Sequence, residues 1–523
     1  MKKLLKVLVA LLLVMCMVLP VFAAGGKEAS SSGPVAIDLW YGAAVTEAGP
    51  PPADWVGYKI IKEKLNIDLK ATALPSNPND QDVKINAAGA ANSLPDLFMV
   101  NRPIWATLVK NGLVAEVGDM LAMMPNRTAI QYDKDSQAHT TINGKLYGLA
   151  SPGSIAKNEG LLIRKDWLDK LGLKVPTTTD ELFNVMKAFT EKDPDGNGKN
   201  DTWGFGAFLE VNTLEGGLGR RLEPIMGAFG VAGTWNMSKD NPGLNVLKPE
   251  YYDAMVYLKK MVDAKVIDPN WLAYKKDDFR ASWKQGKFGI FREQNAAYAS
   301  ESNYAPFDKN FPNGEFLIID APKGPKGLNS MGPFNMAYRI YAVSAKAAAQ
   351  GKKPAIAKLL EWMSSDEGYM LIGYGVKGEN YMLDANGVPT AVGLPDPNKA
   401  WTKPEMQPLT QLRNMVYYNS DKELTTRYPT YKTAVSGKTM SALKALRQMQ
   451  ALTWTPSIGA DTLPTPNADL KRFWEQGVLE FLTGKRELTK ANWDAYIAEF
   501  KKMGAADWEA AGIAAAKANN LLR

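Results

Sequence analysis

The sequence predicts an α/β fold with several domains or lobes, and two observations carry this prediction. Short apolar runs of strand character alternate with segments whose apolar residues recur at helical spacing. This alternation implies a mostly parallel sheet covered by helices. The second observation is the length of 523 residues, which exceeds what one hydrophobic core usually organises.

The expected elements follow in chain order. Strands are expected at residues 35–40, 67–73, 96–100, 160–164, 288–291, 316–319 and 339–343. Helices are expected at residues 55–65, 83–91, 105–113, 166–171, 354–364, 469–482 and 493–502. Gly172 is expected to end one helix, and residues 177–180 to cap the next. The C-terminal third is therefore expected to be mainly helical.

The N-terminus has the pattern of a secretory signal peptide. Three lysines precede an apolar run at residues 7–18, and a small-residue site ends at Ala23. Residues 1–23 are interpreted as this signal and residues 24–33, rich in Gly, Ser and Ala, as a flexible tether. The mature protein is expected to be secreted, in the periplasm or at the outer membrane surface.

The only cysteine, Cys16, lies within this expected signal. A lipoprotein site needs a small residue before the cysteine and polar sequence after it, but Met15 precedes Cys16 and residues 17–22 are apolar. Removal with the signal is favoured, and a lipid anchor is the alternative. In both cases the mature chain has no disulfide and no thiol nucleophile.

The charge and histidine content exclude some functions. The formal net charge is +7, three of these charges are lysines of the leader, and no Lys/Arg run resembles a nucleic-acid patch. The single histidine, His139, argues against a His-based triad or a His-rich metal site. No nucleic-acid partner is expected.

A loop with calcium-binding spacing begins at residue 193. Oxygen-bearing positions alternate at Asp193, Asp195, Asn197, Lys199 (through its main-chain carbonyl) and Asp201. Such alternation is typical of calcium loops, although an EF-hand would have glutamate where this chain has Gly204. The prediction is a structural Ca²⁺, and the alternative is a Gly/Asx-rich turn that caps its own backbone.

Six segments together resemble family 1 of the extracellular solute-binding proteins of ABC importers, in particular its alginate-oligosaccharide-binding and LipO-like branch. They are SLPDLFMVN (93–101), INGKLYGLA (142–150), LLIRKDWLDKLGLKVPTTTDEL (161–182), DPDGNGKNDTWG (193–204), APKGPKG (321–327) and AKLLEWMSSDEGYMLIGYGVKGENY (357–381). Each segment alone is weak evidence for this family, but the six segments occur in the order typical of the family, and as an ordered series they are specific for it.

The resemblance implies a type II periplasmic-binding-protein-like fold, with two hinge-connected lobes that close on a ligand in the cleft between them. By the family pattern the first lobe would hold residues 34–157 and 292–335, and the second 158–291 and 336–523. The crossings between lobes would lie near residues 154–159, 289–292 and 335–338.

The resemblance also implies a function. The chain would be the substrate-binding component of an ABC importer, a monomer without catalytic residues that delivers a carbohydrate, expected to be an oligosaccharide, to permease subunits in the membrane. Two alternatives stay open: the same fold binding a peptide or another small solute, and a secreted carbohydrate-active enzyme with a pair of carboxylates.

Candidate ligand-binding residues follow from this architecture, in which strand ends face the cleft. Residues at expected strand ends are Trp40, Tyr41, Asn101, Arg102, Arg292 and Glu293. Further aromatic candidates, with core packing as the alternative, are Trp203, Trp235, Trp271 and Tyr298.

Two further points concern charged and metal-binding positions. The resembled proteins close the calcium loop with a carboxylate after the ninth position, where this chain has Thr202, so Thr202 completes the expected ligand set with one charge missing. Arg220 and Arg221 are interpreted as a solvated basic pair, with a clamp for an acidic sugar as the alternative.

Overall fold

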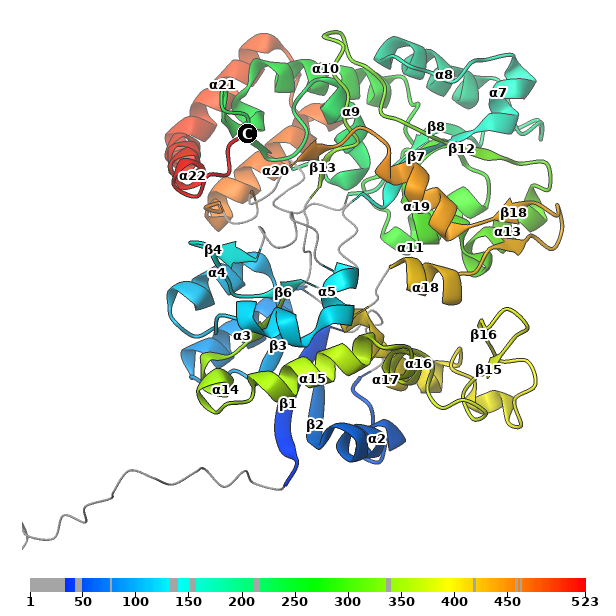
Figure 1. Cartoon of the computed structure of the whole chain (residues 1–523). Helices are drawn as coiled ribbons and strands as arrows, with labels where there is room; N and C mark the ends of the chain where they lie inside the picture. The colour runs from blue at the N-terminus through cyan, green and yellow to red at the C-terminus, as the bar shows by residue number, and fades with distance from the viewer. Residues whose placement is uncertain are drawn as a thin grey trace, which may run out of the picture.

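The computed structural model describes residues 33–42, 49–75, 78–131, 140–150, 157–209, 217–334, 340–416, 420–456, 460 and 463–523. They form two α/β lobes, each with its own sheet (Figure 1). The expected signal peptide, Cys16 and His139 lie outside these residues, as does the expected tether apart from Gly33.

The first lobe has a five-stranded sheet in the order β2-β1-β3-β14-β6. Its strands are β1 (Val35–Gly42), β2 (Ile67–Leu74), β3 (Leu97–Val100), β6 (Leu149–Ala150) and β14 (Ile340–Val343). Strand β1 is parallel to β2 and β3, whereas β14 is antiparallel to β3 and β6. The expectation of a mostly parallel sheet therefore holds only for the first three strands.

Helices cover this sheet and supply its core. They are α2 (Val56–Leu65), α3 (Pro78–Ala90), α4 (Arg102–Lys110), α5 (Pro125–Gln131), α14 (Ala345–Ala349), α15 (Lys353–Ser364), α16 (Asp366–Tyr374) and α17 (Gln407–Thr410). Alternate residues of β1, Ile37, Leu39 and Tyr41, are buried in the same core cluster as Leu359 and Leu360 of α15. The period of two along β1 thus marks which side of the strand meets the core.

The second lobe has a four-stranded mixed sheet in the order β12-β7-β11-β8. Its strands are β7 (Glu159–Arg164), β8 (Trp203–Gly206), β11 (Phe288–Gln294) and β12 (Phe316–Ile319). Strand β7 is antiparallel to β11 and β12, and only β8 is parallel to β11. The expected strands are all present, but the sheet is not mostly parallel.

Twelve helices of the described part belong to the second lobe. Those after residue 420 confirm the expected helical C-terminal part. They are α7 (Lys165–Leu171), α8 (Thr179–Glu191), α9 (Glu223–Ala228), α10 (Pro249–Asp263), α11 (Lys276–Lys284), α12 (Asn295–Ala299), α13 (Glu301–Asn310), α18 (Asp421–Thr426), α19 (Ala442–Gln450), α20 (Ala468–Thr483), α21 (Lys490–Phe500) and α22 (Ala506–Ala518). Helix α20 packs on α10, and Figure 1 shows α20 to α22 together on one side of this lobe.

Short two-stranded ribbons complete the fold. The pairs are β4 (Thr141–Ile142) with β5 (Lys145–Leu146), β9 (Trp235–Asn236) with β10 (Gly243–Leu244), β13 (Pro333–Phe334) with β19 (Thr455–Pro456), β15 (Met382–Leu383) with β16 (Pro389–Thr390), and β17 (Tyr431–Lys432) with β18 (Thr439–Met440).

The predicted end of α7 and the predicted N-terminal cap of α8 are confirmed. Gly172 adopts a left-handed conformation with φ of 63° directly after α7. Thr178 caps α8, because its hydroxyl accepts a hydrogen bond from the Glu181 N–H at 3.2 Å while the Glu181 carboxylate accepts one from the Thr178 N–H. This reciprocal pair is a capping box, which fixes where the helix begins.

The expected lobe boundaries are wrong after residue 291. Residues 292–334 stay in the second lobe, because β11 and β12 pair with β7. Residues 340–416 belong to the first lobe, because β14 pairs with β3 and the following helices pack in the first-lobe core. The chain therefore passes between lobes three times, between Ala150 and Glu159, between Phe334 and Ile340, and between Val416 and Ser420.

The crossing expected at residues 289–292 instead lies inside β11. The third crossing leads into α18, which contacts both lobes. Leu424 of α18 lies in a second-lobe core cluster, whereas Glu423 forms an ion pair of 2.6 Å with Arg413 of the first lobe. Helix α18 therefore ties the lobes together on one side.

Candidate functional site

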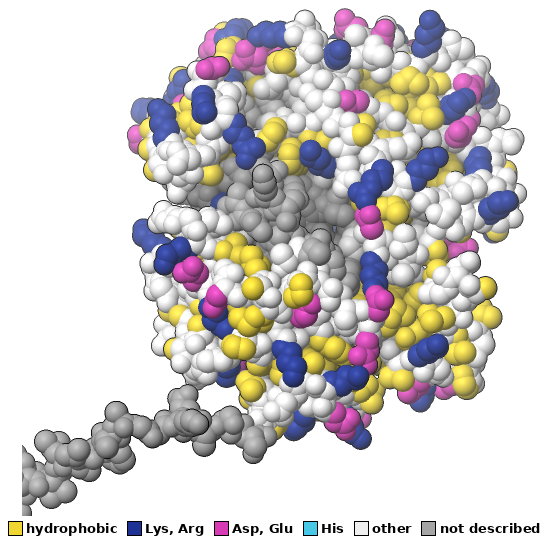
Figure 2. Space-filling model, viewed as in Figure 1, with side chains coloured by type: hydrophobic (Ala, Val, Ile, Leu, Met, Phe, Trp, Pro, Cys, Tyr) yellow, Lys and Arg dark blue, Asp and Glu magenta, His cyan; other side chains and the backbone are white. Residues whose placement is uncertain are grey.

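The strand ends that face the other lobe are those next to the segments in which the chain passes from one lobe to the other. In the first lobe, β3 ends at Val100 and β14 begins opposite it at Ile340, directly after the second crossing. In the second lobe, β7 begins at Glu159 after the first crossing, and Gln294 at the end of β11 lies opposite Glu159. Figure 2 shows the surface hollowed between the two lobes.

A buried ion-pair network occupies this end of the second-lobe sheet. Glu159 lies 2.8 Å from Arg292 Nε, 3.6 Å from Arg221 Nη1, and accepts a hydrogen bond from Arg220 Nη1 at 3.0 Å. Burial alone would raise the pKa of the Glu159 carboxyl, but the three arginines together lower that pKa well below its usual range. Glu159 is therefore a buried carboxylate anion that holds three guanidinium groups.

The same network continues through Glu293. Its carboxylate accepts two hydrogen bonds from Arg280, at 3.0 and 3.1 Å, and lies 3.8 Å from Arg221. Arg221 also donates to the main-chain carbonyl of Arg292 at 2.6 Å. The expected solvated pair at Arg220 and Arg221 is thus wrong, because Arg221 is fully buried and Arg220 keeps only 28% of its side chain exposed.

Two aromatic rings lie beside the network, at the second crossing. Phe334 of β13 and Trp454, next to β19, make an edge-to-face contact with centroids 6.5 Å apart. The Arg292 guanidinium lies 5.5 Å from the Trp454 ring, and Lys157 Nζ lies 4.3 Å from the Phe334 ring. Trp454 and Lys157 are half-buried, so both reach the surface.

We name Lys157, Glu159, Arg220, Arg292, Phe334 and Trp454 the junction cluster. Figure 1 shows β13 on the side of the second lobe that faces the first. Sequence reasoning missed Lys157, Phe334 and Trp454 as site residues, because none follows a predicted strand. The one available signal was that Phe334 directly precedes residues 335–338, which were expected to cross between lobes.

The four expected site residues of the first lobe have different surroundings. Tyr41 is fully buried in the core, and its hydroxyl donates to the Gly49 carbonyl at 3.2 Å, so it is a core residue. Trp40 is half-buried on the opposite side of β1, with Lys84 Nζ 4.4 Å from its ring. Trp40 thus retains the partly exposed ring that a stacking face requires.

Asn101 and Arg102 begin α4 at the end of β3. The Asn101 side chain accepts a hydrogen bond from the Ile104 N–H at 3.1 Å and donates to the Asp82 carboxylate. Arg102 is largely buried, with its guanidinium 5.9 Å from the Trp105 ring. Asn101 is therefore both the helix cap and a polar group at the predicted strand end.

The remaining expected ligand-contacting residues are mostly structural. Arg292 and Glu293 are buried in the ion-pair network. Trp235, Trp271 and Tyr298 lie in second-lobe core clusters, which agrees with the alternative of core packing. Trp203 is half-buried but begins β8, which runs parallel to β11, so it lies at the end of the sheet away from the crossings.

The loop at residues 193–201 is a tight turn with a left-handed backbone at Asp193, Gly196 and Gly198. The Asp193 carboxylate accepts hydrogen bonds from the N–H groups of Gly196, Asn197 and Gly198, at 3.0, 3.0 and 2.9 Å. The loop therefore caps its own backbone, in agreement with the alternative interpretation of a Gly/Asx-rich turn.

Two side-chain hydrogen bonds join three side chains of this loop. The Asn197 amide donates to Asp195 at 2.8 Å and to Asp201 at 3.0 Å. Burial and the neighbouring Asp193 carboxylate raise the pKa of Asp195, whereas the Gly198 N–H lowers the pKa of Asp193. The described residues form no cluster of three or more His, Cys, Asp or Glu side chains already positioned around a metal.

The expected ligand Thr202 does not belong to this set. Its side chain is buried, and its hydroxyl donates to the Phe189 carbonyl at 2.9 Å. The donor chemistry of Asp193, Asp195, Asn197, Asp201 and the Lys199 carbonyl fits calcium, which prefers oxygen ligands. Thr202 instead anchors the loop to α8.

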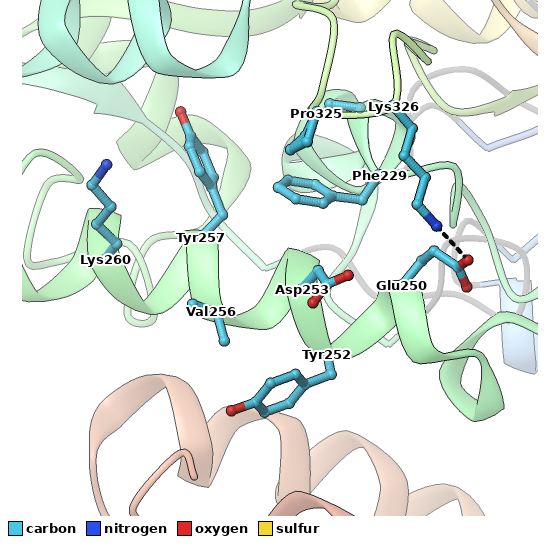
Figure 3. A pocket seen from close by; sticks show the side chains of 10 residues that line it. Phe229, Glu250, Tyr252, Asp253, Val256, Tyr257, Lys260, Pro325 and Lys326 are labelled. Atoms are coloured by element: carbon cyan, nitrogen blue, oxygen red, sulfur yellow. Dashed lines mark hydrogen bonds and ion pairs between the residues drawn. The ribbon is translucent and has the colours of Figure 1, made fainter. Parts of the chain in front are cut away.

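A pocket of about 590 Å³ lies elsewhere on the second lobe (Figure 3). Helix α10 supplies Tyr252, Val256 and Tyr257, and Phe229 and Pro325 close it from neighbouring loops. An ion pair of 2.8 Å joins Lys326 to Glu250 at its edge. Figure 1 shows α10 on the side of this lobe away from the first, so this pocket is separate from the junction cluster.

In the described part of the chain, every helix is too short or too polar to cross a membrane.

Comparison with known proteins places this fold and sequence among binding proteins. The polygalacturonan/rhamnogalacturonan-binding protein YtcQ of Bacillus subtilis is 30% identical over 63% of this chain and 64% of its own length. Lipoprotein LipO of the same organism is 26% identical over 62% of this chain and 64% of its own length. The chain thus spans less than two thirds of either curated relative.

A solved structure shares the fold. The HMO-binding, ABC-transporter-associated solute-binding protein of Bifidobacterium longum infantis superposes with a TM-score of 0.65 at 20% identity, over 91% of this chain and 97% of that one. The two-lobed α/β fold expected from the sequence is thereby confirmed. The family described as bacterial extracellular solute-binding proteins matches residues 43–370, more than half of the sequence, and this chain belongs to that family.

Proposed function

We propose that this protein is the extracytoplasmic binding component of an ABC importer, and that it binds an oligosaccharide between its lobes and delivers it to membrane permease subunits. The observation that carries the proposal is the junction cluster. It sets a half-buried tryptophan and two cations beside two of the crossings between lobes.

The chemistry of this cluster suits a sugar. Pyranose rings offer apolar CH faces that pack on aromatic rings, and their hydroxyls need fixed donors and acceptors. Trp454 supplies a ring whose position is held by Phe334, by Arg292 and by a 3.0 Å hydrogen bond from its Nε1 to the Met449 carbonyl. Trp40 and Asn101 are the matching candidates on the first lobe.

The comparisons support a carbohydrate in particular. YtcQ is named for binding polygalacturonan and rhamnogalacturonan, and the Bifidobacterium protein is titled HMO-binding and ABC-transporter-associated. The proposal extends this ligand class to the present chain. It also includes export by the N-terminal signal, action as a monomer, and binding without bond cleavage.

We further propose a structural calcium ion in the loop at residues 193–201. Asp193, Asp195, Asn197, Asp201 and the Lys199 carbonyl would hold it. The support is that the Asp195 and Asp201 carboxylates both accept hydrogen bonds from the Asn197 amide and so lie close together, since a cation would relieve the repulsion between neighbouring carboxylates. The loop precedes β8 at the far end of the sheet, so the ion would stabilise the second lobe without contacting the ligand.

The test is to incubate the mature protein with an oligosaccharide panel and a peptide library, recover what is retained, and analyse both fractions by mass spectrometry. The proposal predicts that intact oligosaccharides are retained. Retained peptides, or shortened oligosaccharides in the free fraction, would overturn it in favour of a peptide binder or an enzyme.

A further inference from the structure

Helix α18 presents a different face to each lobe. Figure 1 shows α18 between α16 of the first lobe and α19 of the second. Because an α-helix repeats every 3.6 residues, Lys422, Glu423 and Thr426 lie on one side of α18. Asp421 and Leu424 lie on the opposite side. The first side meets the first lobe and the second side meets the second lobe.

The contacts with the first lobe are polar and directional. Glu423 is buried and forms an ion pair of 2.6 Å with Arg413, which lies in the short helix η6 (Gln411–Met415). The hydroxyls of Thr426 and Tyr374 share a hydrogen bond of 2.8 Å. Tyr374 is fully buried in the first-lobe core, so this bond fixes α18 to a rigid part of that lobe.

Further polar contacts extend this interface at both ends of α18. Lys422 forms an ion pair with Asp366, the first residue of α16. Arg427, directly after α18, donates to the Gly373 carbonyl at 2.9 Å, and its guanidinium lies 4.5 Å from the Trp401 ring. The polar contacts with the first lobe therefore run along the whole of this short helix.

The contact with the second lobe is mainly apolar. Leu424 is fully buried in the core cluster that contains Leu446 of α19. Asp421 also forms an ion pair with Arg447 of α19, but both side chains are more than half exposed. Helix α19 in turn packs on α12, β7 and β12, so it is a fixed part of the second lobe.

These two interfaces resist movement differently. Separation of the buried Arg413–Glu423 pair would leave buried charges without their partner, which is strongly destabilising. Apolar contacts require no particular direction, and packed helices slide past each other in shear motions of domains. An exposed ion pair such as Asp421–Arg447 adds little resistance. Movement between the lobes is therefore easier at α19 than at α16.

Resting on the proposed function, we propose that α18 moves with the first lobe when the lobes close on an oligosaccharide. The joint on this side of the molecule is then the contact between α18 and α19. The moving body includes residues up to Arg427, although the first-lobe core cluster ends at Val416. The ion pair and hydrogen bonds to η6 and α16 stay intact during closure, and the Leu424 side chain slides against α19.

Pulsed EPR tests this proposal with two distances measured from one spin label on α18. Cys16→Ser removes the only native thiol, and Thr425→Cys is combined with Lys110→Cys on α4 or with Lys187→Cys on α8. All three labelled side chains are exposed. When an oligosaccharide that the wild-type protein retains is added, the distance from residue 425 to residue 110 should stay the same. The distance from residue 425 to residue 187 should change.

A covalent link tests the same joint through ligand affinity. Asp421→Cys with Arg447→Cys, joined by a short bis-maleimide, should bind about tenfold or more weakly than the same variant unlinked, because fewer molecules can close. The matched control, Asp366→Cys with Lys422→Cys, joins α18 to the first lobe and should change affinity by less than about twofold when linked. Calorimetric titration measures the affinity, and melting curves check that each variant is folded.

The outcomes separate this inference from the proposed function. A ligand-dependent distance between residues 425 and 110 overturns it, as does weakened binding when residues 366 and 422 are linked. Unweakened binding with residues 421 and 447 linked also overturns it. Binding that changes neither distance overturns the inference and leaves the oligosaccharide function standing. If the wild-type protein binds no oligosaccharide, the proposed function fails, and this inference fails with it.

Discussion

Arg292 Nε lies 2.8 Å from Glu159 Oε2, where β7 begins and β11 ends in the second lobe. This ion pair joins two antiparallel strands that are far apart in the sequence. It also fixes the guanidinium that lies 5.5 Å from the Trp454 ring. The relationship connects the stability of the lobe with the position of the proposed sugar-stacking face.

Replacement of the buried carboxylate should destabilise the protein strongly. Glu159→Gln removes the charge that holds three arginines, and breaking a buried ion pair in this way typically costs about 3–5 kcal/mol. The free energy of unfolding in urea measures this cost. The matched control is Glu63→Gln, whose partner Lys59 is exposed and 3.8 Å away, and which should cost about 1 kcal/mol or less. Equal effects of the two changes would contradict the buried network.

The same residue predicts a dependence of stability on pH. Because the arginines lower the pKa of Glu159 in the folded protein, its stabilising effect is present above the ordinary carboxyl pKa of about 4.3 and is lost as the pH falls below it. The wild-type melting temperature should therefore fall more steeply than that of Glu159→Gln between about pH 5 and pH 3. Parallel melting curves for both proteins across that range would argue against a lowered pKa.

Calcium should raise the melting temperature through the loop at residues 193–201. Binding to the native loop alone stabilises the fold by mass action, about 2.7 kcal/mol when free calcium is a hundred times the dissociation constant. Asp201→Asn keeps an oxygen that accepts the hydrogen bond of Asn197, so it should reduce the calcium effect and leave the EDTA value nearly unchanged. The control is Asp384→Asn, in another turn where Asp384 accepts the N–H groups of Asn386 and Val388. A melting temperature unaffected by EDTA, with no metal in elemental analysis, would contradict the site.

Much of the fold was predictable because the pattern of apolar residues is local. The strands at β1, β2, β7, β11, β12 and β14 and the cap of α8 all follow from residues close together in the sequence. The assignment of segments to lobes could not be predicted in this way. Strand β14 pairs with β3 and β6, which lie far earlier in the sequence, and nothing in the sequence of β14 itself specifies those partners.

The site was harder to predict for the same reason. The sequence around Arg220 and Arg221 suggests that both side chains are exposed to solvent. Their partners Glu159 and Glu293 lie on strands some sixty or seventy residues away in the sequence. Trp235 and Trp454 are both loop-flanked tryptophans. Only the fold distinguishes Trp235, which packs edge-to-face on Trp508 in the core, from Trp454 beside a crossing.

Ligand binding should make the molecule more compact. Two lobes joined by three crossings can close around a ligand that contacts both, while α18 holds them together on one side through the Arg413–Glu423 ion pair. Small-angle X-ray scattering should give a smaller radius of gyration with a saturating oligosaccharide than with a sugar that does not bind. An unchanged radius with the bound ligand would indicate a rigid binder.

The central claim is that an oligosaccharide binds at the junction cluster, and calorimetric titration of Trp454→Ala tests it most directly. The titration uses an oligosaccharide that the wild-type protein retains. Loss of the ring should weaken binding by about 2 kcal/mol, or roughly thirtyfold. Trp362→Ala is the control, because Trp362 is half-buried on α15 of the first lobe and lines a separate pocket. The account predicts weakened binding for Trp454→Ala alone, with both variants folded by their melting curves. Wild-type affinity in a folded Trp454→Ala protein would contradict it.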